Sequence, residues 1–221
     1  MVLLDMFEIA HFETQDVCMS YLLEEVDTIF IQRKNPYTLA MSWGSVLTIL
    51  PAILDRMHSD ITLEIYLVDE RYVSYDDIDS NSRALWDILA TYPRVIYHPF
   101  PIRSSAWESR STYADMIEDI HFDLIILGAW PDGHTASLFP QSDALDMTES
   151  VLHTTTDVFA VHDRLTLSFE RMREAGAIWL YFSWAKKSHI YEAFLDAKSD
   201  YHYIPAVKLR EYKQAKVWYV R

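Results

Sequence analysis

The sequence contains few glycines and a single cysteine. Only 4 glycines occur among its 221 residues, although average usage of about 7% would give about 15. Three of them, Gly44, Gly128 and Gly133, fall in two short segments, 42–45 and 128–134. Cys18 is the only cysteine, so an intramolecular disulfide is excluded. A chain without disulfides is typical of reducing compartments, and we expect a cytoplasmic location.

Basic residues are also scarce. The chain has 19 Lys and Arg against 33 Asp and Glu, a formal net charge of -14. Nucleic acids are bound through a basic face, so this balance argues against a nucleic-acid partner. The 7 tryptophans and 14 tyrosines are better explained by packing than by a base-stacking platform. A small anion can still bind to an acidic protein in a local basic pocket.

Long apolar runs are absent as well. No run approaches the roughly 20 residues of a membrane helix, and residues 1–8 lack the basic region of a secretory signal. We therefore expect no membrane association. The length of 221 residues and the 50% hydrophobic content favour one domain over residues 1–221. We expect a monomer or a weak homodimer.

Apolar runs alternate with amphipathic stretches along most of the chain. Strands are predicted over 37–41, 61–68, 94–97, 124–127, 177–182 and 216–220, the last closing the sheet. Helices are predicted over 46–56, which contains Pro51, over 80–89 with Ser80 or Asn81 as the cap, over 107–120 and over 185–196. This pattern predicts an α/β fold with a mainly parallel, twisted, Rossmann-like sheet and helices on both faces. Short alternating runs in 151–167 predict a small antiparallel excursion.

Polar residues follow four of the predicted strands, in segments 42–45, 69–71, 132–134 and 183–186. Ligands of open parallel sheets bind beyond the carboxyl ends of the strands. We therefore expect these four segments to converge on one site.

The segment Asp132-Gly133-His134 is the most informative of the four. It follows a buried apolar strand and a tight turn, which places an acid and an imidazole two residues apart on a stiff support. This layout suits proton transfer, with His134 as base and Asp132 orienting its ring. The alternative is a structural histidine. The 9 histidines show no paired metal-ligand spacing, so we expect no metal.

The other segments offer groups that could hold an anion or polarise a carbonyl. Ser42-Trp43-Gly44-Ser45 could bind an oxyanion through free backbone N–H groups, or could simply cap a helix. Asp69-Glu70-Arg71 could place Asp69 and Arg71 at the mouth of the site, where Arg71 would stabilise developing negative charge, or could be a solvated loop. Arg164 and Lys186 are cations near apolar stretches, and surface cations are common.

A nucleophilic side chain is not indicated. The chain has no Gly-x-Ser-x-Gly elbow, and Cys18 has no local histidine partner. Direct attack by water is the simpler chemistry.

Taken together, these segments resemble the 6-phosphogluconolactonase family. The nine-residue run from Asp132 to Pro140 matches the signature of that family without a gap and is highly specific. Weaker similarities occur in the same order from about residue 38 to residue 206: Ser42-Trp43-Gly44-Ser45, Asp69-Glu70-Arg71-Tyr72-Val73, Ser80-Asn81, Arg164-Leu165-Thr166-Leu167, Ser183-x-x-Lys186 and Ile204-Pro205-Ala206.

The resemblance implies hydrolysis of 6-phospho-D-glucono-1,5-lactone to 6-phosphogluconate, the second step of the oxidative pentose phosphate pathway. It also implies a fold like that of the glucosamine-6-phosphate deaminase and ribose-5-phosphate isomerase group, and no cofactor. His134 would activate the water beside Asp132, while Asp69 and Arg71 would face the lactone ring. The phosphate would be held by Ser42, Gly44, Ser45, Arg164 and Lys186.

The sequence departs from the family pattern at several positions. Trp43 and Trp130 replace small residues, Ser183 replaces Gly, and Val46-Leu47 replaces Thr-Pro. A positive φ at either tryptophan would cost about 1–2 kcal/mol; otherwise each indole could narrow the pocket or cover the ligand. Two alternatives stay open: an isomerase or deaminase of the same fold, which the continuation 135–140 disfavours, and a non-catalytic sugar-phosphate sensor.

Overall fold

A mainly parallel sheet forms the centre of the molecule. The structure is a computed structural model and describes residues 2–4, 7–32, 36–57, 61–183 and 187–221. Within these residues, eight strands lie in the order β1-β2-β11-β10-β7-β3-β4-β6, and only β1 and β2 pair antiparallel. Their bounds are β1 (Val2–Leu4), β2 (Phe7–Phe12), β3 (Tyr37–Met41), β4 (Leu63–Leu67), β6 (Val95–His98), β7 (Leu124–Gly128), β10 (Ile178–Ser183) and β11 (Ala215–Val220). The predicted α/β fold is confirmed.

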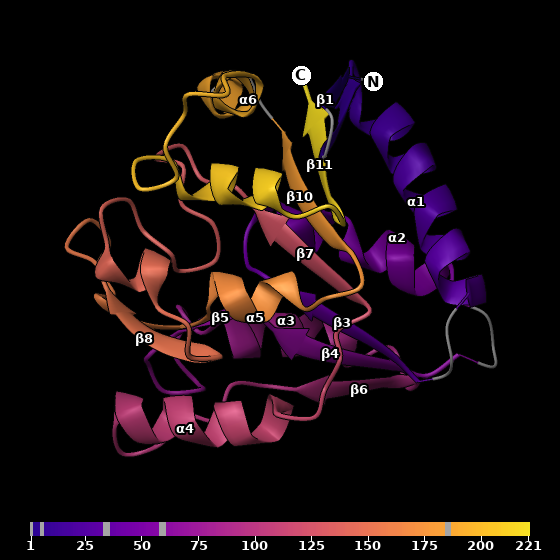
Figure 1. Cartoon of the computed structure of the whole chain (residues 1–221). Coiled ribbons are helices and arrows are strands. Elements are labelled where there is room, and N and C mark those ends of the chain that lie inside the picture. The colour runs from indigo at the N-terminus through magenta and orange to yellow at the C-terminus, as the bar shows by residue number, and fades with distance from the viewer. Residues whose placement is uncertain (1, 5–6, 33–35, 58–60, 184–186) are drawn as a thin grey trace.

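Helices cover both faces of this sheet. Figure 1 shows α1 and α2 on one side and α5 and the yellow helix η4 on the other. The helices are α1 (Gln15–Gln32), η1 (Ser45–Thr48), α2 (Leu50–Asp55), α3 (Asn81–Leu89), α4 (Ala106–Ile117), η2 (Asp143–Asp146), α5 (Phe169–Arg173), α6 (Ser188–Leu195) and η4 (Pro205–Glu211). Every residue of β7 is buried, as expected of a central strand covered on both faces.

Two predictions about elements need correction: the continuity of one helix and the place of one strand in the sheet, although that strand itself is present as β11. The helix predicted over 46–56 is divided into η1 and α2, and Pro51 lies in the first turn of α2, where its missing N–H costs no helical hydrogen bond. The strand predicted over 216–220 does not close the sheet, because β2 pairs with β11 on its outer side. The start of the helix predicted over 185–196 lies outside the described residues.

A second, three-stranded antiparallel sheet lies beside the main one. It contains β5 (Asp69–Arg71), β9 (Asp163–Leu167) and β8 (Val151–Thr155), in that order. The segment Asp69–Arg71 is therefore a strand rather than a solvated loop, and β5 follows β4 after a single residue. This connection brings the carboxyl end of β4 and the strand β9 to the same edge of the main sheet.

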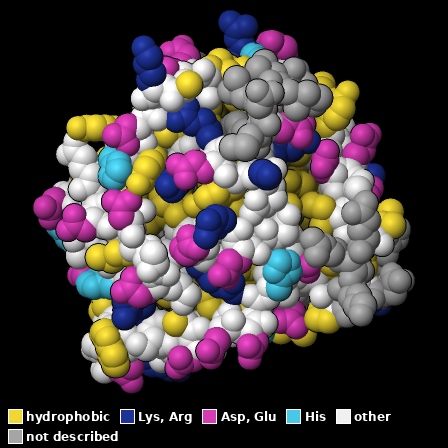
Figure 2. Space-filling view, viewed as in Figure 1, with side chains coloured by type: hydrophobic (Ala, Val, Ile, Leu, Met, Phe, Trp, Pro, Cys, Tyr) yellow, Lys and Arg dark blue, Asp and Glu magenta, His cyan; other side chains and the backbone are white. Residues whose placement is uncertain are grey.

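The surface in Figure 2 shows Asp and Glu side chains spread over this face, with Lys and Arg interspersed rather than gathered in a basic patch. None of the described helices combines the length and apolar composition needed to cross a bilayer.

Candidate active site

A pocket lies at the carboxyl edge of the sheet and is called the polar pocket here. Its walls come from the residues that follow β3 and β7, from β5 and β9, and from the segment between β8 and β9. The lining residues are Ser42, Trp43, Asp69, Arg71, Trp130, His134, Ala136, Ser137, Phe139, Phe159 and Arg164. Five of the residues singled out from the sequence, Ser42, Asp69, Arg71, His134 and Arg164, therefore share one pocket.

The turn that carries His134 is fixed by its own backbone. The Gly133 N–H donates to the Trp130 carbonyl at 2.8 Å, and the Trp130 N–H donates to the His134 carbonyl at 3.0 Å. Ala129 and Thr135 form an antiparallel bridge just outside. Gly133 has a φ of +86°, a conformation that favours glycine.

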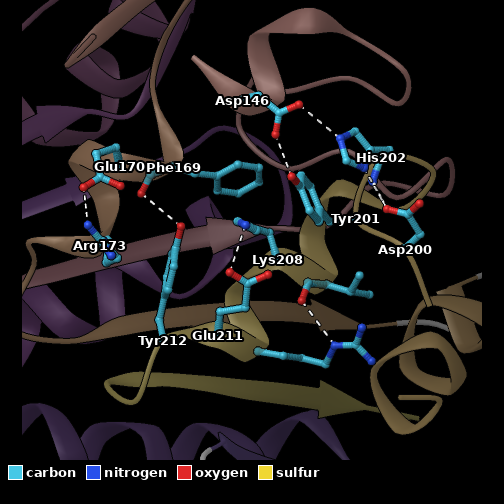
Figure 3. A network of polar contacts seen from close by, with 12 residues as sticks. Asp146, Phe169, Glu170, Arg173, Asp200, Tyr201, His202, Lys208, Glu211 and Tyr212 are labelled. Carbon is cyan, nitrogen blue, oxygen red and sulfur yellow. Dashed lines mark hydrogen bonds and ion pairs between the residues drawn. The ribbon is translucent and has the colours of Figure 1, made fainter. Parts of the chain in front are cut away.

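A neighbouring segment braces this turn from outside the pocket. The Ala206 N–H donates to the Gly133 carbonyl at 2.9 Å, and Ile204 lies so close that a β-carbon at Gly133 would be 2.8 Å from its Cγ2. Figure 3 shows how this segment is held: His202 contacts Asp200 at 2.8 Å and Asp146 at 3.1 Å. The polar cluster around His202 thus supports the position of His134 indirectly.

His134 and Asp132 form a close pair. Nδ1 of His134 lies 2.6 Å from Oδ1 of Asp132. Burial opposes ionisation of Asp132, but hydrogen bonding to His134 and its charge hold the pKa of Asp132 below the ordinary value. Since Asp132 occupies Nδ1 and no hydrogen bond joins Nε2 to another described residue, Nε2 is the nitrogen left for a ligand of the pocket.

Three aromatic rings surround the His134 imidazole, which is only 4% exposed as a residue. Trp130 stacks on it with ring centroids 5.3 Å apart, Phe139 lies at 4.9 Å, and the edge contact with Phe159 is at 5.5 Å. Sequence reasoning did not identify Phe159, which has no local motif around it. Phe139 belongs to the nine-residue run and could have been noticed there.

Asp69 brings a buried carboxyl group to the same pocket. Its Oδ2 accepts a hydrogen bond from Ser137 Oγ at 2.8 Å, whereas its Oδ1 is buried and has no partner. Burial raises the pKa of Asp69, and the charges of Arg71 and Arg164 and the Ser137 hydrogen bond oppose that rise. Ser137 was not singled out from the sequence, although it too lies in the nine-residue run.

Two guanidinium groups face the pocket from adjacent strands. Arg71 of β5 is directly opposite Arg164 of β9 in the antiparallel register. Burial and the charge of Arg71 lower the pKa of Arg164, whose Nε is buried without a partner. Like charges directly opposite each other destabilise a strand pair, so this arrangement favours a bound anion.

Glu70 lies between Asp69 and Arg71 in the sequence but has a structural role. Its carboxylate accepts hydrogen bonds from the N–H groups of Arg71, Asn81 and Ser82 at 2.8, 2.7 and 2.6 Å. Burial raises the pKa of Glu70, and these bonds oppose that rise. Ser80 caps α3 by accepting a hydrogen bond from the Arg83 N–H at 3.1 Å. Of the two predicted caps, Ser80 and Asn81, Ser80 is therefore the one found.

The residues of the expected phosphate loop line two different pockets, with two tryptophans between them: Ser42 lines the polar pocket, and Gly44 and Ser45 do not. Gly44 and Ser45 line a second, mainly apolar pocket, together with Lys187. Trp43 and Trp130 line both pockets. Neither tryptophan is among the described residues with positive φ, so the strain considered for them is not present. Lys186 lies outside the described residues.

Ser42 of the predicted site is engaged in a structural contact, and Cys18, which was not part of that site, lines neither pocket. Ser42 Oγ accepts a hydrogen bond from the Gly128 N–H at 2.9 Å and so ties the end of β3 to that of β7. Cys18 is buried in α1, and burial raises the pKa of its thiol to about 12. Among the described residues, no group of three or more His, Cys, Asp or Glu is arranged to hold a metal ion.

Comparison with known proteins agrees with this architecture. The family of glucosamine-6-phosphate isomerases and 6-phosphogluconolactonase matches residues 13–218. The chain therefore belongs to this family, and the resemblance noted in the sequence is confirmed.

Individual relatives show how far the similarity extends. The chain is 32% identical over 182 residues to the GDH/6PGL endoplasmic bifunctional protein of Oryctolagus cuniculus, covering 74% of this chain but only 23% of that relative. It is 30% identical to the 6-phosphogluconolactonase of Synechocystis, covering 80% of this chain and 78% of that protein. A crystal structure of a 6-phosphogluconolactonase from Shewanella baltica superimposes with a TM-score of 0.82 at 22% identity, with all of both chains covered.

Proposed function

We propose that this protein hydrolyses 6-phospho-D-glucono-1,5-lactone to 6-phospho-D-gluconate, with water activated by His134. The observation that carries the proposal is the His134–Asp132 pair, 2.6 Å apart, at a pocket that also contains Arg71 and Arg164. A base beside two cations suits a substrate that is both an ester and an anion. Membership of a family that includes lactonases supports the same activity.

The reaction follows from the chemistry of these groups. Neutral His134 takes a proton from water at Nε2 while the water oxygen forms a bond to C1 of the lactone. Asp132 stabilises the resulting imidazolium, and the charge on the carbonyl oxygen is offset by Arg71. The C1–ring oxygen bond then breaks, and His134 returns its proton to the ring oxygen, which leaves a carboxylic acid and a hydroxyl group. General base catalysis contributes about 10²–10⁴-fold, and electrostatic stabilisation of the oxyanion about 10²–10³-fold.

The phosphate is best placed against Arg164. Its Nε is buried and lacks a partner, and its guanidinium repels that of Arg71 until an anion lies nearby. The assignment of Ser42, Gly44 and Ser45 is weaker, since Ser42 Oγ is occupied by Gly128 and the other two line the second pocket. Lys187, which lines that pocket and whose pKa is lowered by burial, is the described cation on that side.

A second candidate is an aldose–ketose isomerase or deaminase acting on a phosphorylated amino sugar. Asp69 favours it: this buried carboxyl group has a raised pKa and a free Oδ1, as a base that removes a proton from carbon would need. The only carboxylate in the run from Asp132 to Pro140 is that of Asp132, which is already bonded to His134. The nine-residue run from Asp132 to Pro140 remains the reason to place lactone hydrolysis first.

Two assays on the purified protein separate these functions. Acid release from freshly generated 6-phosphogluconolactone, corrected for the uncatalysed rate, is expected to be fast and proportional to protein concentration. Ammonia release from glucosamine 6-phosphate is expected to be absent. Ammonia without lactone turnover would replace the first proposal by the second, whereas binding of 6-phosphogluconate without either reaction would indicate a sensor.

The proposed setting is that of a cytoplasmic enzyme acting as a monomer or weak homodimer on a small-molecule phosphorylated sugar lactone, without nucleic-acid or membrane partners. The acidic balance of 33 Asp and Glu against 19 Lys and Arg supports the absence of a nucleic-acid partner. Size measurement in solution tests the oligomeric state, and fractionation of cells tests the cytoplasmic location.

A further inference from the structure

Trp130 takes no part in the proposed proton transfers, yet its indole stacks on the imidazole of the proposed base. Its indole is nearly parallel to the His134 imidazole, at 9° and with centroids 5.3 Å apart. Its Cζ2 atom lies 3.7 Å from where a β-carbon of Gly44 would be. The indole therefore fills the space between the imidazole and Gly44, and lines both pockets.

The stacking is a consequence of the backbone of the turn. The hydrogen bond from the Trp130 N–H to the His134 carbonyl and the bridge between Ala129 and Thr135 make positions 130 and 134 neighbours across the turn. A large flat side chain at position 130 is thus brought against the ring at position 134. A glycine at the same position would leave that face of the imidazole uncovered.

The hydrogen bond to Asp132 does not fix the plane of the ring alone. It fixes Nδ1, at 2.6 Å, but a single bond permits the ring to tilt about the contact. The broad torsion at the end of a histidine side chain gives little resistance. Phe159 meets the imidazole edge to face, at 74°, and Phe139 is tilted against it, at 50°, so among these three rings only the indole of Trp130 lies parallel to the plane of the imidazole.

We propose that Trp130 is a positioning residue for the lactonase reaction: its indole keeps Nε2 of His134 turned toward the polar pocket and stabilises the imidazolium that forms when the ring takes the proton of water. This inference rests on the proposed function. The π face of an indole attracts a cation, and this contact adds to the stabilisation that Asp132 gives the imidazolium.

A purely space-filling role makes different predictions. If Trp130 only fills volume, Trp130→Leu and Trp130→Phe should behave alike. If the flat π face matters, Trp130→Phe retains most of the activity because a phenyl ring can still stack. Trp107→Leu is the matched control, because Trp107 is 68% exposed on α4 and is not among the residues that line either pocket.

The kinetic test compares the three variants with the unmodified protein, after thermal melting has shown that each is folded. We expect Trp130→Leu to lower kcat for 6-phosphogluconolactone about tenfold, with KM changed less than about twofold. Trp130→Phe should stay within about threefold of the unmodified kcat, and Trp107→Leu should be unchanged. Equal losses in the Leu and Phe variants, or a loss confined to KM, would overturn the proposal.

A second readout needs no substrate. Nuclear Overhauser contacts between the imidazole protons of His134 and the ring of Phe159, which meets it edge to face, report the orientation of the imidazole. We expect the same contacts in the unmodified protein and in Trp130→Phe, but an altered set in Trp130→Leu. The same set of contacts in all three would overturn the positioning role. If the unmodified protein does not hydrolyse the lactone, the proposed function fails, while this measurement still decides whether Trp130 orients His134.

Discussion

Ile204 lies directly against Gly133, so closely that a β-carbon on the glycine would be 2.8 Å from Cγ2 and 3.0 Å from Cα of the isoleucine. This contact joins the segment before η4 to the turn that carries His134. The hydrogen bond from Ala206 to Gly133 runs between the same two segments. The position of the proposed base therefore depends on residues about seventy positions away in the sequence.

Gly133→Ala should destabilise the protein and lower its activity. The φ of +86° costs a side chain about 1–2 kcal/mol, and the contact with Ile204 adds to that cost. Chemical denaturation measures the loss, and combination with Ile204→Ala should recover only the part due to Cγ2 of the isoleucine, because its Cα and Cβ remain in alanine. Gly128→Ala is the control, because its β-carbon would have neighbours at 3.5 Å or more; equal losses at both glycines would contradict this account.

Glu70→Gln should reduce the free energy of unfolding by about 1–3 kcal/mol. The amide nitrogen of glutamine would replace one carboxylate oxygen among the N–H donors of Arg71, Asn81 and Ser82, and so leave a buried donor facing a donor. Urea denaturation is the measurement. Glu149→Gln, at a side chain that is 58% exposed, should have almost no effect, and an equally small effect at Glu70 would refute its structural role.

Arg164→Met should act in opposite directions on stability and binding. The variant should have a higher Tm than the unmodified protein when no ligand is bound. It lacks one of the two guanidiniums that face each other across β5 and β9, and it also lacks the buried, unpartnered Nε. The KM for the lactone should rise at least about tenfold, the cost of about 1.4 kcal/mol of lost phosphate binding. Arg56→Met, whose guanidinium pairs with Asp27 on the surface, controls for charge; a KM unaffected by Arg164→Met would remove that residue from the phosphate site.

His202→Gln should destabilise the protein more at pH 5.5 than at pH 9. Hydrogen bonds to Asp200 and Asp146 raise the pKa of His202 above its ordinary value of 6.5, so its stabilising charge is fully present below pH 6.5 and is lost as the pH rises through the raised value. The pKa values of Asp146 and Asp200 are lowered, chiefly by bonds from Tyr201 and from His202 respectively, so both carboxylates remain charged at pH 5.5. Thermal melts at the two pH values test this. Because the cluster in Figure 3 is exposed, the difference should be small and should shrink with salt; a difference independent of pH would contradict it.

Most of the main sheet could be predicted from the sequence because its inner strands are nearly continuous apolar runs. β2 escaped prediction, since Phe7-Glu8-Ile9-Ala10-His11-Phe12 mixes polar and apolar residues. β5 escaped because its three residues are all charged. Only the structure shows that Glu70 is buried and that its carboxylate accepts hydrogen bonds from the N–H groups of Asn81 and Ser82 at the start of α3. These donors are eleven and twelve residues away, and no local sequence pattern indicates the contact.

The candidate site could be predicted in part. His134 and Asp132 stand in a specific nine-residue run, and the structure brings them together; their catalytic roles remain predictions. The pairing of Arg71 with Arg164 depends on strand register, and the aromatic ring of Phe159 depends on tertiary packing. The division of the expected phosphate loop by Trp43 and Trp130 depends on where each indole packs, which the residue type alone does not determine.

The most direct test of the account is the rate of acid release from fresh 6-phosphogluconolactone by the unmodified protein and by His134→Gln, with the uncatalysed rate subtracted. We predict that the variant loses about 10²–10⁴-fold in kcat while 6-phosphogluconate still raises its Tm, because Arg164 and Arg71 are unchanged. A folded His134→Gln protein that hydrolyses the lactone at the unmodified rate would contradict the assignment of His134 as the base.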